Sequence, residues 1–392
     1  MNIDQQSYLP KVILHEHLEG SVTPKIAKQL AMNNAINLPS SLFYPVGEYD
    51  DIQFPDGRYF YDESQFNEFI TIYDRVASLI QTADDYYLIT EDYLTRNAQQ
   101  GLIYCELLIS PYHMSASEVN GKVSWDSTRY MDRLLAITRA IEDVNQLYPL
   151  IVRLHAVGVR HLGPDIVYQT LQFVQQNPHD VITGFNIAGN ELSYQFADFS
   201  MSHQLAKQLG LGRSYHAGEI GSDQQIQNAV KAGAVRIGHG IRAIDNEALI
   251  KQLIENKILL EISMTSNRIL VPELNGDIHQ HPIRKLYDKG VRIAINTDDA
   301  GIFGTDINKE YQIAQQTFQF TRIELLDITL CSLEAAFLED EYKELALQQV
   351  YKTFTEDDIK QLQKYVDRPS ISSALVSRLN NHLHYLKNHL LP

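Results

Sequence analysis

The chain has few of the features that mark secreted, membrane or nucleic-acid-binding proteins. Only two of its 392 residues are cysteines, Cys105 and Cys331, which excludes a disulfide framework and a thiolate zinc site. No apolar run reaches the roughly 18 residues that cross a bilayer, and the N-terminal residues lack the basic and apolar regions of a signal peptide. We therefore expect a cytoplasmic protein without a membrane partner.

Basic residues are also scarce. The 33 Lys and Arg residues oppose 49 Asp and Glu residues, so the formal net charge is −16, and no polybasic run occurs. A protein of that charge repels phosphate, so neither nucleic acid nor an anionic membrane is an expected partner. The hydrophobic fraction of 44% and the charged fraction of 21% are typical of a globular protein. The sequence predicts no oligomeric state.

Short apolar segments alternate with segments of helical periodicity along most of the chain. The predicted strands are Val12–His15, Leu102–Ile109, Ile151–Val157, Val181–Ile187, Arg213–His216, Val235–Ile237, Ile258–Ile262 and Val291–Ile295. Such alternation predicts a parallel sheet, and eight units predict a closed (β/α)₈ TIM barrel, an α/β fold. Further helices are expected outside the barrel within Leu325–Leu390. No linker divides the chain, so we predict one domain over residues 1–392.

One irregular segment, Asn37–Glu63, follows the first predicted strand and helix. It is rich in Tyr, Phe, Pro, Gly and Asp and has no clean period, which indicates an insertion. Its aromatic side chains would either cover a pocket as a lid or form a small hydrophobic cluster beneath a loop. The sequence leaves both interpretations open.

Metal-binding and acid–base side chains follow four of the predicted strands. They are His15 and His17 at the first strand, His216 and Glu219 at the fifth, His239 at the sixth, and Asp298 and Asp299 at the eighth. The two histidines of the first pair lie on one face, because side chains alternate along a strand. The carboxyl ends of barrel strands surround a single active-site mouth. The set therefore predicts a metal site, although each motif alone is as readily a turn, a cap or a loop histidine.

Other histidines do not lie at the end of a predicted strand. His279 and His281 form a second His-x-His motif, but it lies in a loop after Gly276 rather than at a strand end. The last helical segment carries His382, His384 and His389, outside the predicted barrel. We interpret all of these residues as structural.

Eight motifs together resemble the adenosine deaminase family of the amidohydrolase superfamily, over about residues 10–338. They are His15-Glu16-His17-Leu18-Glu19-Gly20, Ser110-Pro111, Arg160-His161, Ile187-Ala188-Gly189-Asn190-Glu191, His216-Ala217-Gly218-Glu219, Gly238-His239-Gly240, Thr265-Ser266-Asn267 and Asn296-Thr297-Asp298-Asp299. The resemblance implies a zinc-dependent hydrolytic deaminase. One Zn²⁺ would be bound by His15, His17, His216 and Asp298. The absence of a lysine at the end of the fourth strand argues against a second, bridged metal ion.

The resemblance also implies roles for the surrounding residues. The expected catalytic residues are Glu219, His239 and Asp299. Glu219 would protonate the purine ring, whereas His239 and Asp299 could accept the proton of the attacking water. The residues expected to contact the substrate are His17, Glu19, Gly189 and Arg160.

The departures from the family pattern surround the substrate. Glu19, Asn186 and Asn190 occupy positions where Asp is usual, and Leu108 one where Arg is frequent. Because the Arg160-His161 pair matches the nucleoside-acting branch, we expect adenosine or 2′-deoxyadenosine as the substrate. The alternative is adenine or a modified adenine nucleoside or nucleotide. A non-catalytic purine-binding relative is disfavoured, because the four ligands and Glu219 are all retained.

Overall fold

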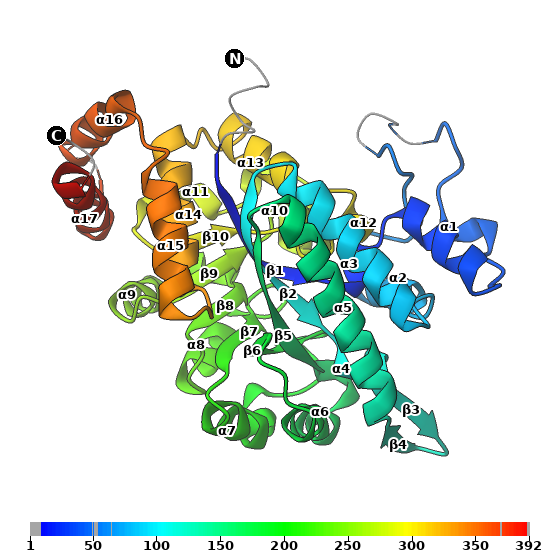
Figure 1. Ribbon diagram of the computed structural model, residues 1–392. Helices are drawn as coiled ribbons and strands as arrows, with labels where there is room; N and C mark the ends of the chain where they lie inside the picture. Colours follow the sequence, from blue (N-terminus) through cyan, green and yellow to red (C-terminus); the bar gives the residue numbers. More distant parts are fainter. Residues whose placement is uncertain (1–8, 49, 51–53, 64, 369–370, 390–392) are drawn as a thin grey trace.

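A ring of eight parallel strands forms the centre of the computed structural model, which describes residues 9–48, 50, 54–63, 65–368 and 371–389 (Figure 1). In chain order the strands are β1 (Lys11–His17), β2 (Leu102–Ile109), β5 (Ile151–Val159), β6 (Ile182–Ala188), β7 (Gly212–Ala217), β8 (Arg236–His239), β9 (Leu259–Ile262) and β10 (Arg292–Ile295). Their order in space is the same, and consecutive strands pair in parallel. The predicted TIM barrel is confirmed.

Helices connect the strands and cover the outside of the ring (Figure 1). They are α1 (Pro24–Asn33), α2 (Phe66–Ala77), α3 (Ala83–Ala98), α4 (Pro111–Ser115), α5 (Ser127–Leu147), α6 (Pro164–Gln176), α7 (Ser200–Gln208), α8 (Asp223–Lys231), α9 (Glu247–Glu255), α10 (Met264–Leu270), α11 (Ile283–Asp288), α12 (Ala300–Phe303), α13 (Ile307–Gln316), α14 (Arg322–Ala335), α15 (Asp340–Tyr351), α16 (Glu356–Val366) and α17 (Ser373–His389). The predicted C-terminal helices are therefore present. A hairpin of β3 (Ala116–Val119) and β4 (Lys122–Trp125) was not predicted.

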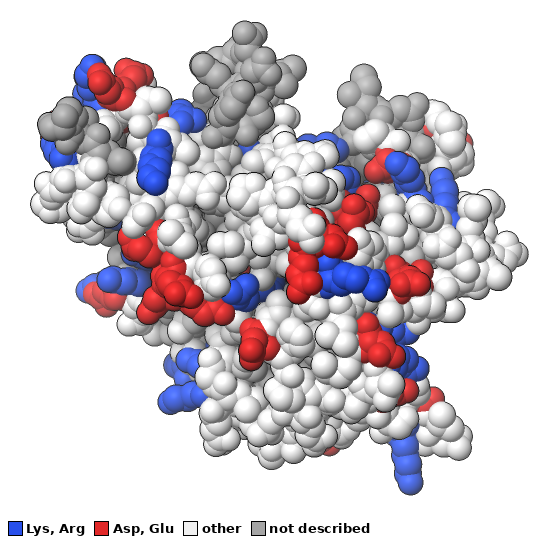
Figure 2. Space-filling model, in the orientation of Figure 1, with Lys and Arg blue, Asp and Glu red and all other residues white. Residues whose placement is uncertain are grey.

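Two further expectations concern the molecule as a whole. None of the helices in the described part of the chain is long and apolar enough to cross a bilayer. On the face drawn in Figure 2, Lys and Arg side chains lie among Asp and Glu side chains rather than in one basic area. That residues 1–392 form a single domain stays a prediction.

The ring closes between β1 and the residues that follow β10. His17 N–H donates to the Asp298 carbonyl at 2.7 Å, and Asp298 N–H donates to the His15 carbonyl at 3.1 Å. On the outer side of the strand, the Glu16 carboxylate accepts hydrogen bonds from the Thr297 hydroxyl and from Ala300 N–H. Barrel closure therefore fixes the ends of β1 and β10 against each other.

A cluster of buried charges fills part of the barrel interior. Arg236 Nε lies 2.6 Å from Glu261 Oε1, and its terminal nitrogen lies 2.5 Å from Glu106 Oε2. His155 Nε2 is 3.1 Å from the same Glu106 oxygen. All four side chains are buried. Since one guanidinium serves two carboxylates, Arg236 is the residue on which this cluster depends.

We therefore predict that Arg236→Leu lowers the free energy of unfolding by about 3–5 kcal/mol, because it leaves two buried carboxylates without their cation. Urea denaturation followed by circular dichroism measures the change. The matched control is Arg139→Leu, whose ion pair with Asp84 is exposed on both sides and should change stability by less than about 0.5 kcal/mol. Equal effects of the two substitutions would contradict the prediction.

Candidate active site

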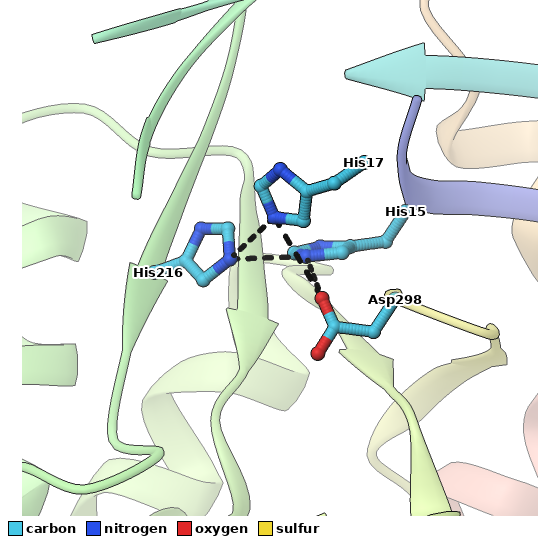
Figure 3. Close-up of side chains that lie close together, drawn as sticks. All are labelled: His15, His17, His216 and Asp298. Atoms are coloured by element: carbon cyan, nitrogen blue, oxygen red, sulfur yellow. Dashed lines mark hydrogen bonds and ion pairs between the residues drawn. The ribbon is translucent and has the colours of Figure 1, made fainter. Parts of the chain in front are cut away.

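Four side chains that could ligate a metal meet at the mouth of the barrel (Figure 3). His216 Nε2 lies 3.1 Å from His15 Nε2 and 3.3 Å from His17 Nε2. Asp298 Oδ1 lies 3.2 Å and 3.7 Å from the same two nitrogens of β1. Ligands about 2.0–2.2 Å from one ion are roughly 3.3–3.6 Å apart at tetrahedral corners. The four atoms therefore have the spacing of a tetrahedral metal site.

Hydrogen bonds behind the cluster fix which ring nitrogens face its centre. His15 Nδ1 lies 2.8 Å from Glu261 Oε2, and His216 Nδ1 lies 2.8 Å from Asn186 Oδ1. Both partners are oxygen acceptors, so each Nδ1 carries a proton and each Nε2 faces the centre of the cluster, where a metal ion would bind it. Burial lowers the pKa of His17 to about 3 and lowers that of His216 well below its usual value. Burial opposes it, but the Asp298 and Glu261 carboxylates raise the pKa of His15 to about 10, so a divalent cation at this point would take the place of the proton on His15 Nε2.

Three further titratable groups surround the same point. Glu219 Oε2 lies 3.7 Å from His239 Nε2, which in turn lies 4.0 Å from Asp298 Oδ2. Burial, together with the Asp298 and Glu191 carboxylates, raises the pKa of Glu219 well above its usual value and so favours a protonated acid. Burial and neighbouring carboxylates also raise the pKa of Asp299, which makes it a stronger base.

Close backbone packing leaves room for Asp299 only because residue 20 is glycine. A Cβ at Gly20 would lie 1.8 Å from Asp299 Oδ1. That oxygen is buried and has no hydrogen-bond partner among the described residues. Two residues at the strand ends, His239 with φ of 61° and Asp298 with φ of 67°, adopt the left-handed conformation that costs non-glycine residues about 1–3 kcal/mol. Such strain is concentrated at functional sites.

A cavity opens beside these groups. Its wall contains the predicted residues His17, Gly189, His216, Glu219, His239, Asp298 and Asp299, together with Phe66, Phe69, Ile70, Tyr73, Asp74, Ser110, His113, Val157, Val159, His161, Ala188 and Leu270. The structure therefore brings most of the predicted site residues to one cavity. His15 lies directly behind this wall, in contact with His216.

The structure places Arg160 away from this cavity, although the sequence predicted a substrate contact. Its guanidinium is buried and donates to the Tyr194 carbonyl at 2.7 Å, and its neighbour His161 lines the cavity instead. Glu19 also lies behind the wall. It accepts from Ser110 N–H at 3.2 Å and from the Tyr73 hydroxyl at 3.3 Å.

The aromatic cover of the cavity comes from α2 rather than from the insertion. Phe66, Phe69 and Tyr73 have the three- and four-residue spacing of one helix face, a signal that was present in the sequence. No described residue of Asn37–Glu63 lines the cavity. Within that segment the Phe43 and Tyr59 rings pack at 5.5 Å, and the Tyr59 hydroxyl donates to Val22 O. This arrangement favours the hydrophobic-cluster interpretation of the insertion.

Comparison with known proteins agrees with this site. The family model described as adenosine deaminase matches residues 10–353. The chain belongs to the adenosine deaminase family. An adenine deaminase from Sinorhizobium medicae is 33% identical over 87% of this chain and 98% of its own length. One from Rhizobium rhizogenes is 35% identical over 85% and 96%. The protein is therefore a hydrolytic deaminase of the adenosine deaminase family.

Solved structures share the fold. An adenine deaminase from Arthrobacter aurescens superposes with a TM-score of 0.76 at 23% identity, covering 88% of this chain and 98% of its own. A zinc-bound amidohydrolase from Burkholderia ambifaria gives a TM-score of 0.74 at 22% identity, covering 90% and 95%. At these identities the likeness concerns the barrel. The family match ends before α16 and α17, so these two helices lie outside it.

The hydrogen bond behind His216 gives a prediction about metal affinity. Asn186→Ala removes the acceptor for His216 Nδ1–H, so the ring can rotate and present either nitrogen. We expect the affinity for a divalent metal ion to fall by about 10–100-fold, measured by competition with a chromophoric chelator. Thr183→Ala, on the opposite face of the same strand, is the control and should keep the affinity. An unchanged affinity in Asn186→Ala would show that His216 is oriented by other contacts.

Proposed function

We propose that this protein hydrolyses adenine to hypoxanthine and ammonia, with one Zn²⁺ in each chain. Relatives that are 33% to 35% identical to this chain, and matched along nearly their whole length, are named adenine deaminases. The structural observation that carries the proposal is the buried Glu19 carboxylate, which lies directly behind the cavity wall and accepts hydrogen bonds from Tyr73 and Ser110 of that wall. Our expectation from the sequence put adenosine first and adenine second, and the comparisons favour the reverse order.

The Glu19 carboxylate suits a free base better than a nucleoside. It accepts two hydrogen bonds, from Tyr73 and Ser110, and both of these residues line the cavity. A carboxylate has about four acceptor positions, so Glu19 can take a further donor. Free adenine carries an N–H on its five-membered ring, whereas the ribose of a nucleoside replaces that hydrogen. A hydrogen bond to this N–H would therefore select the base.

Zn²⁺ fits the four converging ligands. Imidazoles and a carboxylate are ligands that zinc prefers, and the ion can expand its coordination to five to admit the reacting water. The ligands would be His15, His17, His216 and Asp298, whose atoms lie within 4.8 Å of one another. When bound there, the metal ion supplies a water that is activated at neutral pH.

The surrounding side chains then provide the proton transfers. Glu219 donates its proton to the purine nitrogen N1, which makes C6 electrophilic. Water adds to C6 and gives one proton to Asp299. The C6–N6 bond breaks, and the amino group leaves as ammonia with the proton from Asp299. The proton on the new C6 hydroxyl restores Glu219, so the two carboxyl groups return to their initial states. His239 lies beside both the acid and the metal ligands.

Substrate choice is tested by comparing kcat/KM for adenine, adenosine, 2′-deoxyadenosine and N6-methyl-AMP. An unpaired buried acceptor costs about 1–3 kcal/mol, so adenine should exceed adenosine by roughly 10–100-fold. Glu19→Gln should lower the value for adenine by about 10-fold or more and change that for adenosine little. A higher kcat/KM for adenosine, unaffected by this substitution, would make the nucleoside the substrate.

The role of Glu219 is tested separately. Glu219→Gln removes the proton donor and keeps the shape of the side chain, so kcat should fall by about 10²–10⁴-fold. Elemental analysis should give about one Zn per chain for both proteins. The exposed Glu255 of α9 supplies the control, Glu255→Gln, which should keep full activity. Near-normal turnover in Glu219→Gln would mean that another group protonates the ring.

A further inference from the structure

A row of hydrogen bonds leads from a backbone amide to the buried side of His239. Ile283 N–H lies 3.1 Å from His281 Nδ1. His281 Nε2 lies 3.1 Å from Asn267 Oδ1, and Asn267 Nδ2 lies 3.0 Å from His239 Nδ1. The three side chains are buried and come from the end of β8, from α10 and from the loop before α11.

The direction of every bond in this row follows from its first member. A backbone N–H can only donate, so His281 Nδ1 is an acceptor and carries no proton. A neutral imidazole has one N–H, and His281 Nε2 therefore donates to the Asn267 carbonyl oxygen. The Asn267 amide is then oriented with its NH₂ group toward His239, whose Nδ1 must accept. The remaining proton of neutral His239 is on Nε2, which points at Glu219 and Asp298.

We propose that His281 and Asn267 are positioning residues that hold His239 as the Nε2–H tautomer, so that His239 donates a hydrogen bond into the active site. The tautomer follows from the hydrogen-bond geometry alone. That its Nε2–H meets the water or the developing oxygen on C6 rests on the proposed function. In this arrangement Nε2 has no lone pair for the proton of the attacking water, and Asp299 receives that proton alone. This revises the expectation that both residues accept it.

The environment of His281 agrees with a neutral ring. Burial, with His239 nearby, lowers the pKa of His281 to about 3. The Phe318 ring covers it at 6.1 Å. Its partner in the second His-x-His motif, His279, is exposed, so the two histidines of that motif differ in role. The chain therefore offers His279 as a natural control.

The decisive measurement is ¹⁵N NMR of the zinc-loaded protein with labelled histidine, because protonated and unprotonated ring nitrogens have well-separated shifts. A His239→Gln spectrum identifies the His239 signals by their loss. We expect a protonated Nε2 and an unprotonated, hydrogen-bonded Nδ1. A proton on Nδ1 of His239 would overturn the proposal, whichever purine is the substrate.

Asn267→Asp tests the consequence for turnover. A carboxylate accepts from both neighbouring rings, so His239 should move its proton to Nδ1 and lose the donor that faces the site. We expect kcat to fall by about 10²–10³-fold with unchanged zinc content, as for the loss of one active-site donor. Asn267→Leu, which adds no charge, should also lower kcat, whereas His279→Gln should change neither kcat nor the NMR signals of His239.

These outcomes separate the possible explanations. A purely structural role for Asn267 predicts lower thermal stability with an unchanged His239 tautomer, and that result would overturn the proposal. Unchanged kcat in Asn267→Asp with a reversed tautomer would also overturn it, because His239 would not need its Nε2–H. If the unaltered protein does not deaminate adenine, the proposed function fails while the ¹⁵N spectrum still decides the tautomer.

Discussion

Two backbone hydrogen bonds, between His17 and Asp298 and between Asp298 and His15, hold both the barrel and the active site together. They close the ring between β1 and the residues after β10, which do not pair as two regular strands. The same bonds set three of the four ligands side by side. Asp298 takes a left-handed backbone at this point, and the closure bonds offset the conformational cost. The same hydrogen bonds therefore fix both the closure of the barrel and the positions of the ligands.

Charge in the barrel interior favours a cation at this mouth. Glu106 and Glu261 share the single Arg236 guanidinium, and Glu261 together with Asp298 raises the pKa of His15 to about 10 against the effect of burial, so this mouth attracts positive charge. Although burial raises it, Arg236 and His15 hold the pKa of Glu261 below its usual value, so the carboxylate stays ionised beside His15. Glu261 accepts from His15 Nδ1–H and thereby makes its Nε2 a better ligand. The buried cluster and the metal site thus stabilise each other, because each supplies charge that the other lacks.

The sequence predicted the fold and the ligand cluster because both depend on where strands end. His17 and His239 are the last residues of β1 and β8, within a few residues of the predicted ends. Contacts between distant loops could not be predicted in this way. The sequence favours a structural role for His281 because it lies in a loop rather than at a strand end. Its link to His239 passes through Asn267, and no spacing rule predicts such a link. The sequence also could not predict which way the Arg160 side chain points. That direction depends on the loop after β6, where the Tyr194 carbonyl accepts its hydrogen bond.

The ranking of adenosine before adenine depended on a side chain whose direction the sequence does not give. The motif Arg160-His161 favoured a nucleoside, but only His161 faces the cavity, and the guanidinium faces the protein interior. The groups that we propose to perform the reaction lie at or just after strand ends, where the barrel fixes their positions. The groups that we propose to face the five-membered ring, Tyr73 of α2 and Ser110 with Glu19 behind them, belong to connecting segments. Connecting segments can change without disturbing the barrel. A motif shared across the family therefore predicts the reaction better than it predicts the substrate.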